Sequence, residues 1–133
     1  MRFPSAQIEL TVQFDEIDSF RIAHHSRLVV YLERARIQLF AALGFRISAP
    51  QFAAAVYSMK LDFKKPARML EQLTVSSEIE RIDGFKLILT ERIRRGSALI
   101  MKAKTEIAFL ELADFQPVPV ESVFPGLQES LCR

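Results

Sequence analysis

The sequence predicts an α+β protein in which a curved antiparallel sheet of about five strands wraps around one long central helix. In several stretches apolar residues alternate with polar ones, as in strands that are buried on one face. In one long stretch apolar residues recur at three- and four-residue steps, as along one side of a helix. Because the later strands follow one another through hairpin-type turns, this single helix must cover the apolar face of the sheet.

The first strand is expected at residues 7–14, where the alternation is regular. The long helix is expected from about Arg27 to Leu43. The Ser26 hydroxyl would cap its N-terminus, and Gly44 would end it. The apolar positions that define its buried side are Leu28, Leu32, Ala35, Leu39 and Leu43.

The later strands are expected at residues 57–64, 72–82, 85–93 and 99–109. Tyr57 is expected on the same face as Met59, Leu61 and Phe63. Asp83-Gly84 is expected as a two-residue hairpin, and Arg95-Gly96 as a second turn. We expect one domain over residues 1–133, with residues 114–133 as a proline-containing C-terminal tail.

The charge distribution indicates an ordinary solvated surface. The net charge of +2 is too small to indicate a nucleic-acid partner. Arg34 and Arg36 are accordingly expected on the exposed side of the helix. No apolar run approaches the ~20 residues that span a bilayer, so no membrane insertion is expected. The first ten residues lack a signal-peptide core, and Cys132 is the single cysteine, so a reducing cytoplasmic location is expected.

The predicted sheet also leaves unpaired edges. Pairing such edges across a two-fold axis protects them, so a homodimer or homotetramer is expected.

Residues 14–36 resemble the motif of hotdog-fold thioesterases in the 4-hydroxybenzoyl-CoA thioesterase group and its YbgC-like branch. In that motif a strand ending in an aromatic residue precedes D-x-D, a His, and a helix containing E-R-A-R. The matching residues here are Phe14, Asp15, Asp18, His25 and Glu33-Arg34-Ala35-Arg36. The resemblance extends from about residue 6 to about residue 118 and implies a hotdog fold.

By this resemblance, Asp18 attacks the thioester carbonyl or activates the attacking water, and His25 assists catalysis. The backbone N–H of His25 would polarise the carbonyl. From the residues alone, a turn in which the side chain bonds the backbone explains Asp18 better than a catalytic role does. Asp15 is expected to support the loop. Glu33 is a second candidate base, because some hotdog enzymes use a carboxylate on the helix.

Three further side chains are expected to line the substrate pocket, namely Phe20, His24 and Tyr31. A metal site at His24 and His25 is not expected, because neighbouring side chains diverge on a helix. Lys64, Lys65 and Arg68 match a basic segment common in the family and would bind the phosphates of coenzyme A. A solvated strand end explains the same residues equally well. No separate cofactor is expected, since coenzyme A is part of the substrate.

The sequence therefore predicts an acyl-CoA thioesterase that acts without a metal. Two alternatives stay open: a thioesterase for fatty or polyketide chains on an acyl carrier protein, and a non-catalytic acyl-CoA-binding protein. Ser19-Phe20-Arg21 and Arg27-Leu28 differ from the small residues and the Asn-Tyr of the family pattern, which favours the non-catalytic alternative.

Overall fold

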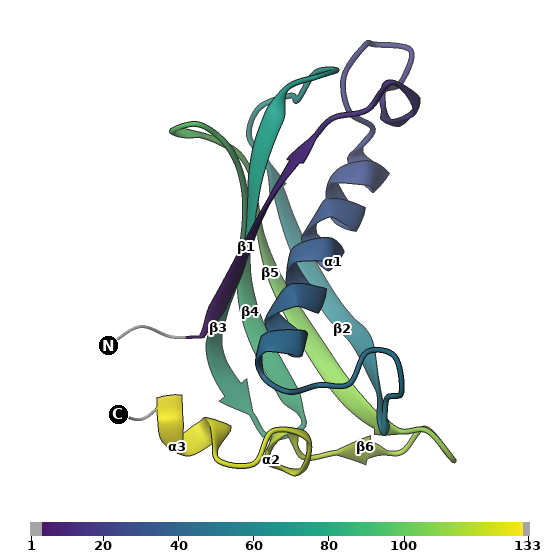
Figure 1. The fold of residues 1–133 in the computed structure, drawn as a ribbon, viewed down its shortest axis with the longest axis vertical. Helices are drawn as coiled ribbons and strands as arrows, with labels where there is room; N and C mark the ends of the chain where they lie inside the picture. Colours follow the sequence, from purple (N-terminus) through teal and green to yellow (C-terminus); the bar gives the residue numbers. More distant parts are fainter. Residues whose placement is uncertain (1–3, 132–133) are drawn as a thin grey trace.

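A curved antiparallel sheet packs against one long helix in the computed structural model, which describes residues 4–131 (Figure 1). The strand order is β1-β3-β4-β5-β2, and a short strand β6 pairs with β5. The elements are β1 (Ser5–Thr11), the 3-10 turn η1 (Phe14–Glu16), α1 (His25–Ala42), β2 (Phe52–Phe63), β3 (Gln72–Asp83), β4 (Lys86–Arg95), β5 (Ala98–Glu111), β6 (Pro117–Val118), α2 (Val120–Val123) and α3 (Leu127–Leu131). This arrangement confirms the predicted fold class.

Tight turns join β3 to β4 and β4 to β5. Gly84 and Gly96 lie in these turns, each with a φ of 59°, a conformation that glycine adopts at little cost. Asp83 still pairs with Lys86, so the first loop is Gly84-Phe85 and lies one residue later than predicted. The register of β5 places alternate residues from Met101 to Phe109 in the core, as the alternation predicts.

Helix α1 begins at His25, two residues earlier than predicted. The cap is His24, whose ring Nδ1 accepts a hydrogen bond from the backbone N–H of Ser26 at 3.2 Å. The prediction that Ser26 caps the helix is therefore wrong: an imidazole nitrogen takes the place of the hydroxyl oxygen. The predicted end is close to the observed one, since Gly44 follows the helix with a φ of 94°.

Strand β2 is longer than predicted and contains a bulge. It begins at Phe52, and its pairing with β5 shifts register between Val56 and Ser58. The extra residue turns Tyr57 away from the helix, where its ring lies under the ammonium group of Lys86 at 4.2 Å. The prediction that Tyr57 shares a face with Met59 is wrong for this reason.

A buried ion pair joins the middle of α1 to the sheet. Arg36 donates to Glu91 of β4 through Nε at 3.1 Å and Nη2 at 2.8 Å. Ser77 of β3 and Thr105 of β5 also donate to the Glu91 carboxylate, at 2.8 and 2.6 Å. Arg36 is thus buried, although the sequence placed it on the exposed side of the helix. Charge alone could not reveal its partner, which lies 55 residues away.

The C-terminal segment folds back onto one end of the sheet. Val120, Phe124 and Leu127 are buried there, against Phe40 and Phe109. These three side chains of the predicted tail therefore belong to the core. Cys132 lies outside the described residues, so the expectation of a reducing location, which rests on it, stays a prediction. The described chain contains no helix that is both long and apolar enough to cross a bilayer.

We predict that Glu91→Ala destabilises the fold by about 3–5 kcal/mol, because the buried Arg36 guanidinium loses its partner. Urea unfolding measures the change. Glu80→Ala is the matched control, since Glu80 pairs with Lys104 at 3.3 Å on the surface. This control substitution should lower the free energy of unfolding by less than about 1 kcal/mol. Equal losses would show that the buried pair contributes no more than a surface pair.

Candidate functional site

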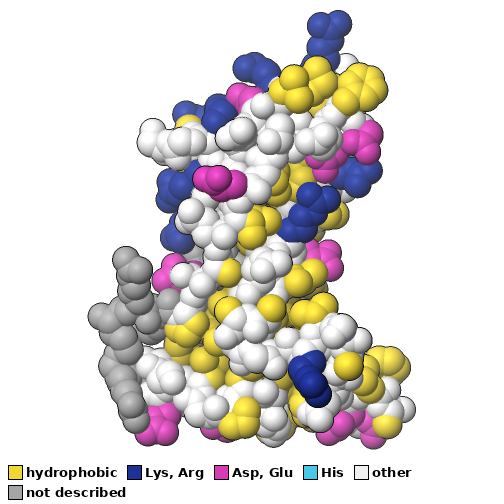
Figure 2. Space-filling model, viewed as in Figure 1, with side chains coloured by type: hydrophobic (Ala, Val, Ile, Leu, Met, Phe, Trp, Pro, Cys, Tyr) yellow, Lys and Arg dark blue, Asp and Glu magenta, His cyan; other side chains and the backbone are white. Residues whose placement is uncertain are grey.

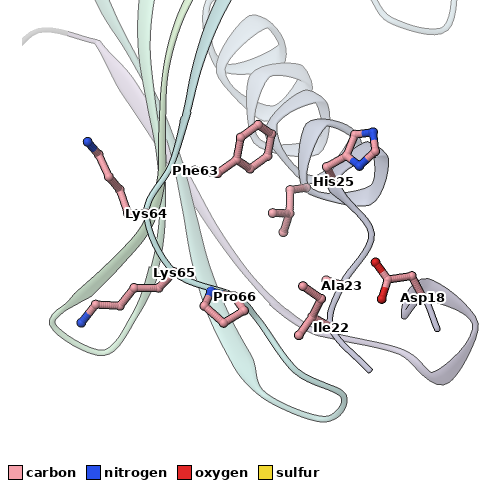
Figure 3. A pocket seen from close by; sticks show the side chains of 9 residues that line it. Asp18, Ile22, Ala23, His25, Phe63, Lys64, Lys65 and Pro66 are labelled. Atoms are coloured by element: carbon pink, nitrogen blue, oxygen red, sulfur yellow. The ribbon is translucent and has the colours of Figure 1, made fainter. Parts of the chain in front are cut away.

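A cavity of about 420 Å³ opens between the loop before α1 and the end of β2. One wall comes from this loop and the first turn of the helix, and the other comes from the chain that leaves β2 (Figure 3). The lining residues are Asp18, Ile22, Ala23, His25, Leu28, Phe63, Lys64, Lys65 and Pro66. The cavity therefore combines an apolar interior with a carboxylate and an imidazole at its edge.

Asp18 is held in a tight turn of the loop. Its backbone N–H donates to Ile22 at 2.9 Å, and its carbonyl accepts from Arg21 at 2.9 Å. Its Oδ1 accepts from the backbone N–H of Phe20 at 2.8 Å. No hydrogen bond from residues 4–131 reaches Oδ2. The carboxylate therefore has one oxygen fixed by the turn and one available to a ligand, and Figure 3 shows it on the same side of the cavity as His25.

The N-terminus of α1 faces the same cavity. The first N–H groups of a helix have no partner within the helix, and those of the first turn carry its positive dipole end. The N–H of Ser26 already donates to the ring of His24. The N–H of His25 has no acceptor among the described residues, so it stays available. The two imidazole rings lie with their centroids 4.1 Å apart and their planes tilted by 31°, and His25 is the exposed member.

Glu16 anchors the Asp18 loop to the helix. Its Oε1 accepts from the hydroxyl of Tyr31 at 2.9 Å and from the backbone N–H of Gln13 at 2.9 Å. Its backbone carbonyl accepts from the N–H of His24 at 2.9 Å. Burial and the bond to Glu16 raise the pKa of Tyr31 well above its ordinary value, so the phenol stays protonated and donates. The loop and the helix cap therefore share one buried anchor.

Sequence reasoning missed Glu16. It assigned the first acid of D-x-D to Asp15, which is exposed and whose side chain makes no hydrogen bond in the described chain. The motif has one residue between its acids, and that spacing fits Glu16 and Asp18 rather than Asp15 and Asp18. The loop-supporting role predicted for Asp15 thus belongs to Glu16. The spacing was the signal that could have identified it.

The three predicted pocket residues lie outside the cavity in the single chain. Tyr31 is fully buried beneath the loop, where it supports the site instead of lining it. Phe20 projects outward and is 81% exposed. The His24 side chain caps helix α1 by accepting a hydrogen bond from Ser26. The apolar wall consists instead of Ile22, Ala23, Leu28 and Phe63.

Glu33 lies apart from Asp18 and His25. It borders a second groove of about 240 Å³ between α1 and β2, beside Arg36 and Met59. Eight residues separate it from His25, which is about 12 Å along the helix axis. Within one chain Glu33 and Asp18 therefore do not face the same cavity.

The basic residues are placed at the outer side of the cavity. Lys64 and Lys65 line it, but Figure 3 shows both side chains pointing away from Asp18 and His25. Arg68 is exposed and does not line it. Within residues 4–131, His, Cys, Asp and Glu side chains form no group of three that could hold a metal ion.

The family model described as the thioesterase-like superfamily matches residues 12–130. The chain belongs to this superfamily, and the predicted assignment to hotdog-fold thioesterases is confirmed.

Among curated proteins, the chain is similar to the acyl-CoA thioesterase YbgC of Haemophilus influenzae, with 24% identity over 80% of this chain and 82% of the relative. It is also similar to the putative acyl-CoA thioesterase YneP of Bacillus subtilis, with 27% identity over 88% of each chain. Among solved structures, the DHNA-CoA thioesterase of Staphylococcus aureus matches with a TM-score of 0.83 and 19% identity, over 96% of this chain and 89% of that one. This last likeness concerns the fold.

We predict that Tyr31→Phe loosens the Asp18 loop, because Glu16 loses the hydroxyl that ties it to the helix. Amide hydrogen exchange at residues 18–23 should become about tenfold faster, while exchange in β4 stays unchanged. Tyr57→Phe is the matched control, since the sequence contains two tyrosines and Tyr57 is 62% exposed. The anchor assignment is wrong if the two variants exchange alike in the loop.

Proposed function

We propose that this protein hydrolyses an acyl-CoA thioester to a free acid and coenzyme A. One observation carries the proposal: Asp18, which has one carboxylate oxygen without a partner in the described chain, and His25, whose backbone N–H also has none, line one apolar cavity. The first can activate or deliver a nucleophile, and the second can stabilise negative charge on an oxygen. The names of the curated relatives supply the substrate class.

Asp18 acts in the first step as general base or as nucleophile. As a base, Oδ2 takes a proton from a water molecule while the water oxygen attacks the thioester carbon. As a nucleophile, Oδ2 attacks that carbon itself, and water later hydrolyses the resulting anhydride. In both routes the C–S bond breaks and the sulfur leaves as a thiol after protonation. The N–H of Phe20 holds Oδ1 in place, so the active oxygen does not have to be reoriented.

The carbonyl oxygen of the substrate would lie at the N-terminus of α1. The N–H of His25 donates to it, and the helix dipole adds to the stabilisation as negative charge develops. The imidazole of His25 is exposed at the cavity edge, where it can protonate the leaving sulfur. The proposed reaction uses no metal and no cofactor beyond the coenzyme A of the substrate.

The substrate would span the cavity. Ile22, Leu28 and Phe63 would contact the acyl group near the reacting carbon. The outward direction of Lys64 and Lys65 suits the phosphates of coenzyme A on the surface, with Arg68 nearby in the same loop. The same outward lysines would also suit an acidic acyl carrier protein, which keeps that class of thioester as the second candidate.

We further propose that the protein acts as a homodimer or homotetramer in the cytoplasm. Strand β2 lies at the edge of the sheet, where Val56, Tyr57 and Phe63 are each at least 50% exposed. Pairing of this edge with a second copy would cover these side chains. It would also bring residues of the partner to the open side of the cavity.

We predict that Asp18→Asn lowers kcat for acyl-CoA hydrolysis by at least about 100-fold, with a smaller change in substrate binding. The substitution keeps the bond to Phe20 and removes the charge, so the melting temperature should be retained. His25→Ala should lower kcat less than Asp18→Asn does, because the backbone N–H of residue 25 remains. Thiol release over acyl-CoAs of increasing length measures both. Near wild-type turnover in Asp18→Asn would transfer the role to Glu33, and an inactive wild type would favour the non-catalytic alternative.

We predict that replacing Lys64, Lys65 and Arg68 by Ala weakens binding of coenzyme A by about tenfold or more, because charge-assisted phosphate contacts are lost. Binding of a phosphate-free pantetheine thioester should change little. Calorimetry with both ligands separates the two effects. Lys102→Ala on β5 provides a control for the loss of surface charge. Equal weakening for both ligands would assign the three residues a structural role.

A further inference from the structure

Two loops lie at the end of the molecule where the β4–β5 turn also lies, and we call them the tip: residues 12–23 before α1 and residues 64–71 after β2 (Figure 1). Three backbone hydrogen bonds fasten them together. Val12 donates to Glu71 at 3.0 Å, Leu70 donates to Val12 at 2.8 Å, and Ala23 donates to Ala67 at 2.7 Å. The tip is therefore one connected surface.

The tip exposes large apolar side chains. Phe14 is 77% exposed, Phe20 is 81% exposed, and Leu70 is 69% exposed. Met69 adjoins Leu70 and is 41% exposed. Figure 2 shows hydrophobic side chains gathered at this end of the molecule. A cluster of this kind on adjoining loops differs from the single exposed apolar residues of ordinary surfaces and indicates a contact surface.

Basic side chains accompany the apolar ones. Arg21, Lys64, Lys65 and Arg68 are all exposed on the tip, against the exposed carboxylate of Asp15 and the half-buried carboxylate of Asp18. The Glu71 carboxylate is already engaged, since it accepts from Arg95 at 2.9 Å and from the backbone N–H of Arg68 at 2.6 Å. The exposed charge of the tip is therefore positive, although the whole chain carries only +2.

We propose that the tip docks on a membrane surface rich in anionic lipids. Phe20 and Leu70 enter the boundary between headgroups and acyl chains, and the basic side chains contact lipid phosphates. The complementarity of charge selects this partner, because apolar groups flanked by cations match an anionic interface. The projecting shape of the tip also suits a deformable lipid surface. This binding does not require hydrolysis of acyl-CoA, although it uses basic side chains that we also propose for the phosphates of coenzyme A.

Docking at the tip would place the candidate site beside the membrane, because the loops that bear the exposed residues also supply Asp18 and Pro66 to the cavity. An acyl group that leaves the cavity could then enter the lipid directly. The membrane contact would thus serve an amphipathic substrate or product of the site.

Vesicle flotation of the full chain tests the proposal. The wild type should float with vesicles of mixed phosphatidylglycerol and phosphatidylcholine at least about tenfold better than with phosphatidylcholine alone, and added salt should weaken the binding. The double variant Phe20→Ser, Leu70→Asn should lose binding to the anionic vesicles by about tenfold or more. Asn is chosen for position 70 because Leu70 has a φ of 67°, which Asn tolerates.

Leu112→Ser with Phe115→Asn is the matched control. These residues are 47% and 63% exposed near the opposite end of the molecule, and Phe115 also has a positive φ, of 56°. This variant should float like the wild type. Arg21→Asn should weaken binding without removing an apolar group.

Failure of the wild type to float with anionic vesicles overturns the proposal, as does equal loss in the control variant. A smaller sedimenting mass of the tip variant, with no vesicle binding by the wild type, would instead identify the tip as a contact between copies.

Discussion

The ion pair between Arg36 and Glu91 is the constraint on which the arrangement of helix and sheet depends. Apolar contacts alone would allow α1 to slide or rotate over the sheet, because they have little directionality. The carboxylate of Glu91 receives hydrogen bonds from α1, β3 and β5, and it is itself part of β4. Buried charges tolerate little displacement from their partners. One apolar cluster lies toward the N-terminal half of the helix and another toward its C-terminal half, and the ion pair fixes both in register.

The two walls of the candidate site are brought together by this register, because one belongs to the helix and its loop and the other to the sheet. Once α1 is fixed over the sheet, Tyr31 holds Glu16, and Glu16 in turn holds the loop that presents Asp18. The position of the carboxylate relative to the helix N-terminus is therefore set by local bonds within residues 13–31. The opposite wall of the cavity depends on the sheet, because the chain leaving β2 is held there by hydrogen bonds from Lys64 and Lys65 to the carbonyl of Ile100.

Features governed by local periodicity could be predicted from the sequence. The strands and the long helix follow from alternation and from three- and four-residue spacing, and the position of Asp18 ahead of the helix follows from their order. Features that depend on distant partners could not. The burial of Arg36 requires Glu91, and the displacement of Tyr57 requires the register of β5. The cap at His24 was missed for a different reason, because an imidazole is a less usual acceptor at that position than the neighbouring Ser26 hydroxyl. The wall residues Ile22 and Phe63 come together only in the folded chain.

The bulge at Tyr57 has a consequence for the solubility of the protein. A long, regular edge strand is a template on which further chains can add without limit, as in fibrous aggregates. The bulge interrupts the regular repeat of backbone donors and acceptors near the middle of β2, and Lys86 holds the displaced ring to one side. A strand arriving at this edge meets two short segments that are out of phase instead of one continuous ladder. Open-ended growth is thereby disfavoured, while a symmetric partner carrying the same irregularity can still be accommodated.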